Sequence, residues 1–152
     1  MSTTIRQSIV NNVITALQTI LVSNGFNTDV GVNVFEWLEY STDSTVRPCL
    51  IVRDRSDKPE KNEPHVSDRR LTLEILIQTS GTACVSQARS IIGDIYDAIK
   101  TGDSFGGYVY WIEEQGDDME AIHEEDKNCS DQLTFTLFYK TEYMNMYNVR
   151  NV

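Results

Sequence analysis

The sequence predicts an α+β domain in which a mainly antiparallel sheet of about four to five strands carries two helices packed on one face. Two segments repeat apolar residues every three or four positions, as one buried helix face requires. Five shorter segments alternate apolar and polar residues or are largely apolar, as strands do. Their order is helix, strand, strand, strand, helix, strand, strand, which is typical of helices gathered on one side of a sheet.

Both helices have identifiable boundaries. The first is predicted over Thr3–Ser23, where eight apolar residues recur at helical spacing: Ile5, Ile9, Val10, Val13, Ile14, Leu17, Ile20 and Leu21. A hydroxyl side chain among residues 2–4 can cap its start, and Asn24-Gly25 supplies a stop, because glycine adopts the left-handed conformation at little cost. The second helix is predicted over Ala83–Lys100.

The first two strands are predicted to pair as a hairpin. Val30–Glu39 alternates valines with small or polar residues and then Phe35 and Trp37 with Glu36. A polar turn, Ser41–Thr45, separates it from the short strand Pro48–Arg53, whose proline stands at the start, where a missing donor is tolerated.

Three further strands follow. Arg70–Gln78 places Leu71, Leu73, Ile75 and Ile77 on one face, with Leu76 as the exception on the other. Tyr108–Ile112 and Leu133–Tyr143 are the last two strands. Two helices cover only one face of such a sheet. The other face is then expected to keep an open apolar surface, made of Phe35, Trp37, Leu76, Tyr108, Tyr110 and Phe138.

Two stretches are predicted to lie outside regular structure. Asp54–Asp68 holds charged residues, two prolines and Val66 as its only aliphatic residue, which indicates a long exposed loop. Residues 1–143 are expected to form one domain, and residues 144–152 a poorly ordered C-terminal tail.

Charge and cysteine content exclude several classes of protein. Of the net charge of −10, the segment Glu113–Asp131 contributes nine acids against one base, Lys127. It is interpreted as a solvated, charged hairpin tip. The sequence has no cluster of Lys and Arg for binding nucleic acid, no pattern of a signal peptide or membrane span, and no paired cysteines.

No catalytic, cofactor or metal site is expected, and the chain is predicted not to be an enzyme. His65 and His123 stand apart from any nucleophile motif. An alternative is a metal-dependent nuclease using Asp54 and Glu74, although Leu76 occupies the position where such enzymes carry a lysine. Adventitious cations could bind five acids: Asp117, Asp118, Glu124, Glu125 and Asp126.

The order and local character of the elements resemble the tail terminator family of lambda-like long-tailed bacteriophages, also called tail completion or minor tail proteins. The segments that carry the resemblance are IRQSIVNNVITAL, VFEW, PCLIV, RRLTLEILIQ and LTFTLFYKTEY, and they span nearly all of the chain. A departure is the acidic segment, which is longer than the family pattern leads one to expect.

The resemblance implies a structural virion protein at the head-proximal end of the tail, assembled in the host cytoplasm. Such a protein forms a ring, in the family a homohexamer, that caps the tail tube at its final length and provides the head-joining surface. Its partners would be further copies of itself, the major tail (tube) protein and the head connector or stopper protein. DNA would pass through the ring without specific binding, since the acidic segment repels phosphate.

By position, twelve residues are candidates for the interfaces of the ring: Arg53, Asp54, Arg55, Asp57, Lys58, Lys61, Phe35, Trp37, Tyr108, Tyr110, Asp117 and Asp118. Two further readings stay open. One is a head completion or stopper protein of the head-tail connector, and the other is a single-domain interaction module of a bacterial cell.

Overall fold

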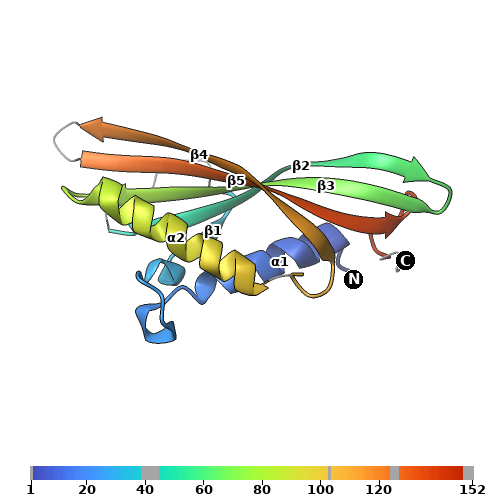
Figure 1. Cartoon of the computed structure of the whole chain (residues 1–152), viewed down its shortest axis with the longest axis horizontal. Helices are drawn as coiled ribbons and strands as arrows, with labels where there is room; N and C mark the ends of the chain where they lie inside the picture. The colour runs from blue at the N-terminus through green and yellow to red at the C-terminus, as the bar shows by residue number, and fades with distance from the viewer. Residues whose placement is uncertain (1, 39–44, 103, 124–126, 149–152) are drawn as a thin grey trace.

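A computed structural model describes residues 2–38, 45–102, 104–123 and 127–148, with the backbone alone at 61–62 and 122–123. One five-stranded sheet and two helices make up the chain, which confirms the predicted α+β class (Figure 1). Both helices lie on the same side of a strongly twisted sheet, and both ends of the chain lie near the same end of the molecule. The face opposite the helices is called the outer face below.

Helix α1 spans Ile5–Gln18 and α2 spans Cys84–Gly102. The Thr4 hydroxyl accepts a hydrogen bond of 3.1 Å from the amide of Gln7, so the predicted N-cap is confirmed at that residue. Helix α1 ends five residues earlier than predicted. Two short 3-10 turns follow it, η1 (Val22–Asn24) and η2 (Val30–Val32). Neither helix is long and apolar enough to cross a membrane, as far as the described residues go.

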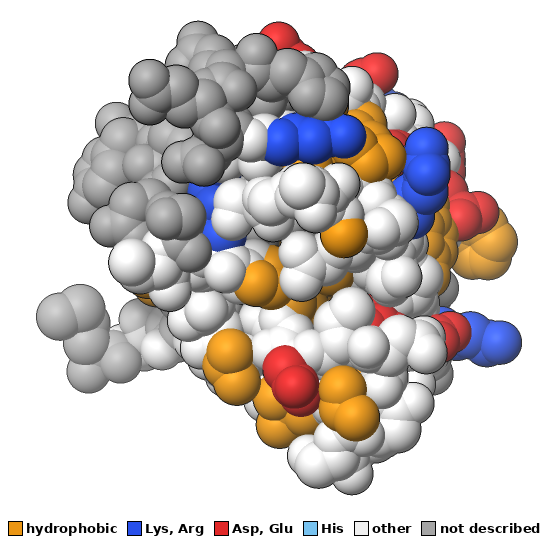
Figure 2. Space-filling model, turned by 90° about the vertical axis from the view of Figure 1, so that its left-hand side faces the viewer, with side chains coloured by type: hydrophobic (Ala, Val, Ile, Leu, Met, Phe, Trp, Pro, Cys, Tyr) orange, Lys and Arg blue, Asp and Glu red, His pale blue; other side chains and the backbone are white. Residues whose placement is uncertain are grey.

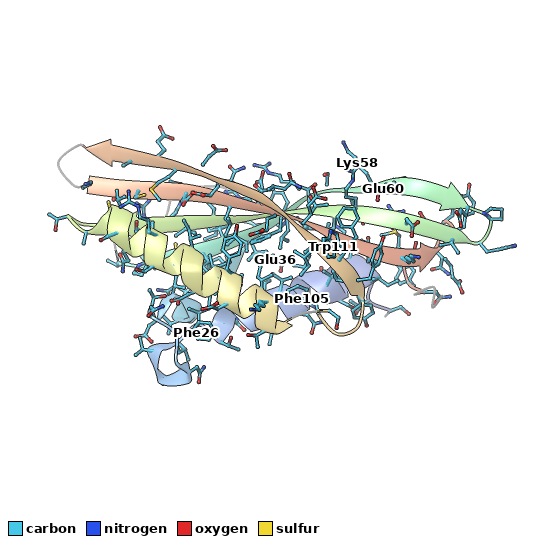
Figure 3. All side chains as sticks on the ribbon, in the orientation of Figure 1. Phe26, Glu36, Lys58, Glu60, Phe105 and Trp111 are labelled. Carbon is cyan, nitrogen blue, oxygen red and sulfur yellow. The ribbon has the colours of Figure 1, made fainter. Side chains whose placement is uncertain are left out.

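The sheet has the strand order β1-β2-β3-β5-β4. Its strands are β1 (Val34–Glu36), β2 (Cys49–Glu63), β3 (Val66–Ser80), β4 (Val109–His123) and β5 (Lys127–Glu142). All neighbouring pairs run antiparallel except β1 with β2. The predicted alternation in β3 is confirmed, because Leu71, Leu73, Ile75 and Ile77 are all buried in the core under the helices. Figure 3 places Phe105 at the C-terminal end of α2, where it closes this core.

The predicted hairpin of Val30–Glu39 with the next strand is wrong. Only β1 is a strand here, and it pairs in parallel with β2, Val34 opposite Leu50. The cause lies in η2, where the amide of Gly31 donates to the carbonyl of Ile20 at 2.9 Å. A Cβ at Gly31 would come within 2.7 Å of that same carbonyl oxygen, so the chain is held against the end of α1 and enters the sheet from there. The predicted turn Ser41–Thr45 lies outside the described residues except for Thr45.

The predicted loop Asp54–Asp68 is also wrong, because most of it is strand. β2 and β3 continue as a long hairpin closed by a two-residue turn, Pro64-His65, and it extends beyond the helices (Figure 1). Bulges at Arg55 and Glu60 interrupt the pairing. A sequence pattern based on apolar alternation misses this hairpin, because its inward position is filled by Asp57, whose carboxylate accepts from Arg69 at 3.0 Å and from the Tyr139 hydroxyl.

The acidic segment is more than the expected hairpin tip, because it runs along β4 from Glu113 and into β5 as far as Asp131. Most of its acids lie along β4, which pairs with β5 over nearly the whole of both strands. Glu124, Glu125 and Asp126, which were candidates for cation binding, lie outside the described residues. The segment forms a strand despite its charge because Ile112, Met119 and the apolar residues of β5 give it a partly buried side.

The first residues of the predicted C-terminal tail form hydrogen bonds with the rest of the domain. The amide of Ile5 donates to the carbonyl of Met146 at 2.8 Å, and the amide of Glu142 donates to the carbonyl of Asn148 at 3.0 Å. The carbonyl of Met146 thereby satisfies one of the unpaired amides at the start of α1. Residues 149–152 lie outside the described part.

A buried carboxylate fastens the segment after η1 to α2. Asp94 is fully buried, and its two oxygens accept four hydrogen bonds of 2.7–3.1 Å from the amides and side chains of Asn27 and Thr28. Substituting Asp94→Ala is expected to lower the free energy of unfolding by about 3 kcal/mol, because several donors lose their acceptor at once. Denaturant unfolding measures this. Asp97→Ala, an exposed acid on the same helix, should change it by less than about 0.5 kcal/mol.

Candidate assembly interface

Two edges of the sheet lack a strand neighbour within the described chain. β4 is the last strand of the sheet, so its fifteen residues pair on one side only. At the opposite side, β1 covers β2 no further than Val52. From Asp54 onward β2 has β3 as its only described strand partner. Unpaired strand edges present rows of backbone donors and acceptors that can pair with another chain.

The edge of β4 is strongly acidic. It carries Glu113, Glu114, Asp117, Asp118 and Glu120, all of them exposed, and no lysine or arginine between Val109 and His123. The candidate residues Asp117 and Asp118 therefore both lie on an accessible edge. Burial raises the pKa of the nearby Tyr96 hydroxyl, and the charge of Glu114 raises it further, which leaves that hydroxyl neutral.

The free edge of β2 mixes both charges, and two of its four acids, Asp54 and Asp57, are engaged within the chain, whereas Glu60 is exposed. Asp54 turns toward the helices, where it accepts from Arg6 and from the Trp37 indole, both at 2.5 Å. Asp57 is held by Arg69, with 3% of its side chain exposed. Both of these carboxylates therefore already have partners within the chain.

The basic candidates on this edge are more accessible. Arg55 is exposed and forms an ion pair of 2.7 Å with Glu74, whereas the guanidinium of Arg53 donates to the carbonyl of Leu38. Lys58 is exposed and points away from the helices in Figure 3. Lys61 lies in β2 by its backbone, and its side chain is outside the described atoms. Lys58 and Arg55 are therefore the best-placed basic groups for a contact.

A shallow polar groove of about 570 Å³ runs over the outer face. Lys58 and Arg70 stand on its β2–β3 side, and Asp117 and Asp118 on its β4 side. Its other lining residues are Ser56, Thr72, Gln115, Gly116, Thr134 and Thr136. The groove joins the two edges across the sheet and presents opposite charges at its two sides.

The expected continuous apolar outer face is only partly present. Phe138 is nearly buried and lies 6.4 Å from the ring of Tyr110, which is 54% exposed, while Leu76 and Phe35 are half-buried. Trp37 is exposed beside Arg55. Tyr108 packs against the core instead, and the threonines of the groove occupy the middle of the face. At the end of the molecule seen in Figure 2, hydrophobic side chains also form small groups separated by polar atoms.

Sequence reasoning missed two residues. Trp111 is 61% exposed next to Tyr110, because a bulge between Val109 and Trp111 shifts the register of β4. Asp131 was counted with the exposed acids but is fully buried. Local sequence gives no signal for the bulge, although the alternation of Cys129, Asp131, Leu133 and Phe135 does place Asp131 on an apolar side.

The residues proposed for a nuclease do not converge. Asp54 lies opposite Leu73, on the helix side of the sheet, whereas Glu74 lies opposite Arg53, on the outer face. Both carboxylates are held by arginines of the same chain. Within the described part of the chain, no three His, Cys, Asp or Glu side chains are grouped so that they could hold a metal ion.

The three cysteines are buried free thiols, and His65 occupies the turn between β2 and β3 with φ of 71°. The side chain of His123 is outside the described atoms. The arrangement thus offers edges and charges for association with another chain. Neither the family models nor the curated proteins include a match to this chain.

Proposed function

We propose that this chain is a structural virion protein that associates head to tail into a ring, caps the tail tube of a long-tailed bacteriophage and provides the head-joining surface. The observation that carries the proposal is the pair of open sheet edges, acidic on β4 and partly basic on β2, at opposite sides of one domain. The resemblance in the order of elements to tail terminators supports the choice of virion context.

The charges favour a head-to-tail contact over a two-fold one. Pairing β4 with a second β4 would set five acids against five acids, and like charges across a strand pair are destabilising. Pairing β4 with the β2 edge of a neighbour brings Arg55 and Lys58 toward those acids. A contact between two different surfaces repeats from copy to copy, and it closes into a ring when the rotation allows.

The partners follow from this arrangement. A ring leaves two flat ends for stacking, one for the major tail protein and one for the connector or stopper protein of the head. The net charge of −10 per copy repels phosphate, so DNA would pass through the ring without binding.

Labelling the chain in purified particles tests the virion role. Tails and DNA-filled heads of the phage that encodes the chain would be separated and imaged with a gold-labelled antibody. We expect label at one end only of the free tails. Label on tail-less heads would support the head completion alternative instead, and label on neither would contradict any role at the head-tail junction.

A further inference from the structure

The carboxyl of Asp131 in β5 is buried without a hydrogen-bond donor of normal geometry for either of its oxygens, as far as the described chain goes. The residue is 0% exposed. A buried polar group without a partner is costly, and an ionised one is far more so. Something must therefore neutralise this carboxyl when β4 is in place.

The polar group that Asp131 meets is another acid. Asp117 lies on the neighbouring β4, two residues from the position directly opposite Asp131, and its carboxyl makes a side-chain contact with that of Asp131. Two carboxyls can share a hydrogen bond only when one of them holds a proton. The arrangement is therefore consistent with one proton between the two groups.

Among the residues that the structure describes, no positively charged group acts on Asp131, and Lys127 at the start of β5 acts on Cys129 instead. Asp118 of β4 adds a second negative charge, and β3 presents Ile77 at the paired position. On β5 itself, burial raises the pKa of the Cys129 thiol, so this neighbour stays neutral, and Cys84 of α2 is a second buried thiol close to it. The amide of Gln132 is the one group that favours the ionised form.

The influences that favour the neutral form outweigh that of the Gln132 amide. Burial first, and then the hydrogen bond and the charge of Asp117, raise the pKa of Asp131 from its usual value near 4 to about 7. The group thus changes charge in the physiological range. It lies in β5, directly beside the acidic edge strand β4 on which the proposed self-association depends.

We propose that a single proton, shared by the carboxyls of Asp131 and Asp117, holds the part of β4 around Asp117 against β5. Release of this proton to water loosens β4. The loosened strand then weakens the association of copies through the β4 edge. Without the proton, the buried carboxylate of Asp131 and the adjacent carboxylate of Asp117 repel each other. Detachment of β4 then gives Asp131 access to water. The part of the inference that concerns association rests on the proposed function, and the part that concerns β4 does not.

Hydrogen exchange of the full chain at pH 5.5 and pH 8 tests the local part. If Asp131 regains an ordinary pKa when β4 opens, the opening constant for amides around Cys129–Leu133 should rise roughly 30-fold between these pH values, after correction for intrinsic exchange. Asp131→Asn should remove most of this rise. Glu120→Gln is the matched control, because it removes an exposed negative charge from the same strand that does not act on Asp131, and it should retain the rise.

Two results would overturn the inference. One is an equal pH dependence in the Asp131→Asn variant. The other is restored protection at pH 8 on adding Mg²⁺ or Ca²⁺ to the unaltered protein alone, since a cation rather than a proton would then neutralise the pair. Should Asp131→Asn fail to fold, a carbon-13 titration of the Asp131 carboxyl in the unaltered protein decides: a midpoint near 7 supports the inference, and an ordinary one contradicts it.

Sedimentation over the same pH range separates this inference from the proposed ring. We expect oligomers to dissociate as the pH rises and the Asp131→Asn variant to resist dissociation. A chain that is monomeric at every pH but keeps the pH-dependent protection would refute the ring and leave the proton link standing. Oligomers whose stability does not change with pH would refute the link to association.

Discussion

Replacing Asp57 with alanine is expected to lower the free energy of unfolding by about 3–5 kcal/mol, the usual effect of removing one partner of a buried charge pair. Asp57 stands in the middle of the β2–β3 hairpin and accepts from Arg69 and from the Tyr139 hydroxyl. Its loss leaves the Tyr139 hydroxyl, in a fully buried residue, without its acceptor. Urea unfolding followed by circular dichroism measures the change.

The neighbouring residue provides the control for this prediction. Lys58 is exposed on the same strand, so Lys58→Ala should change the free energy of unfolding by less than about 0.5 kcal/mol. Equal, small effects at both positions would mean that residues 54–68 are a mobile loop after all. They would contradict the buried network on which the hairpin depends.

Reversing the charge of the β4 edge is expected to abolish self-association. In the double variant Asp118→Lys, Glu120→Lys, two exposed acids become bases, which would then face Arg55 and Lys58 of the neighbour. We expect the apparent dissociation constant to rise at least about 100-fold, since repulsion between like charges in an interface costs several kcal/mol. The unfolding midpoint of the monomer should change little, because exposed charges contribute little to stability.

A variant with one reversed charge away from the edge controls for net charge. Asp97→Lys lies on the exposed side of α2 and should leave association unchanged within about twofold, as expected for an exposed charge that touches no interface. If the edge variant assembles as well as the unaltered chain at low salt, the β4 edge is not the contact surface. Comparable loss in both variants would point to overall charge instead.

Apolar periodicity was enough to predict the two helices, strand β3 and the fold class. Leu71, Leu73, Ile75 and Ile77 show why: an apolar residue at every second position has only one buried arrangement. The hairpin beyond this core was not predictable in the same way. Its inward positions hold Asp57 and Arg69, which bond to each other, and Asp57 also accepts from Tyr139, which is distant in the sequence.

The candidate interface could be predicted only in part, again because it depends on contacts between residues that are distant in the sequence. The acidity of the segment around Asp117 and Asp118 is visible in the sequence, but its position on an edge strand depends on the pairing of β4 with β5. The exposure of Trp111 could not be predicted, because a bulge changes the register of β4 between Val109 and Trp111. The direction of β1 depends on the contact of Gly31 with α1, which no local pattern encodes.

The mass of the purified full chain in solution, measured by sedimentation and imaged by negative stain at about pH 6, tests the central claim most directly. Association through two open edges predicts a single closed species whose mass is a whole multiple of the 17.3 kDa chain, with a central hole. A 17.3 kDa particle at every concentration would contradict it. So would a dimer with two-fold symmetry that joins its β4 strands.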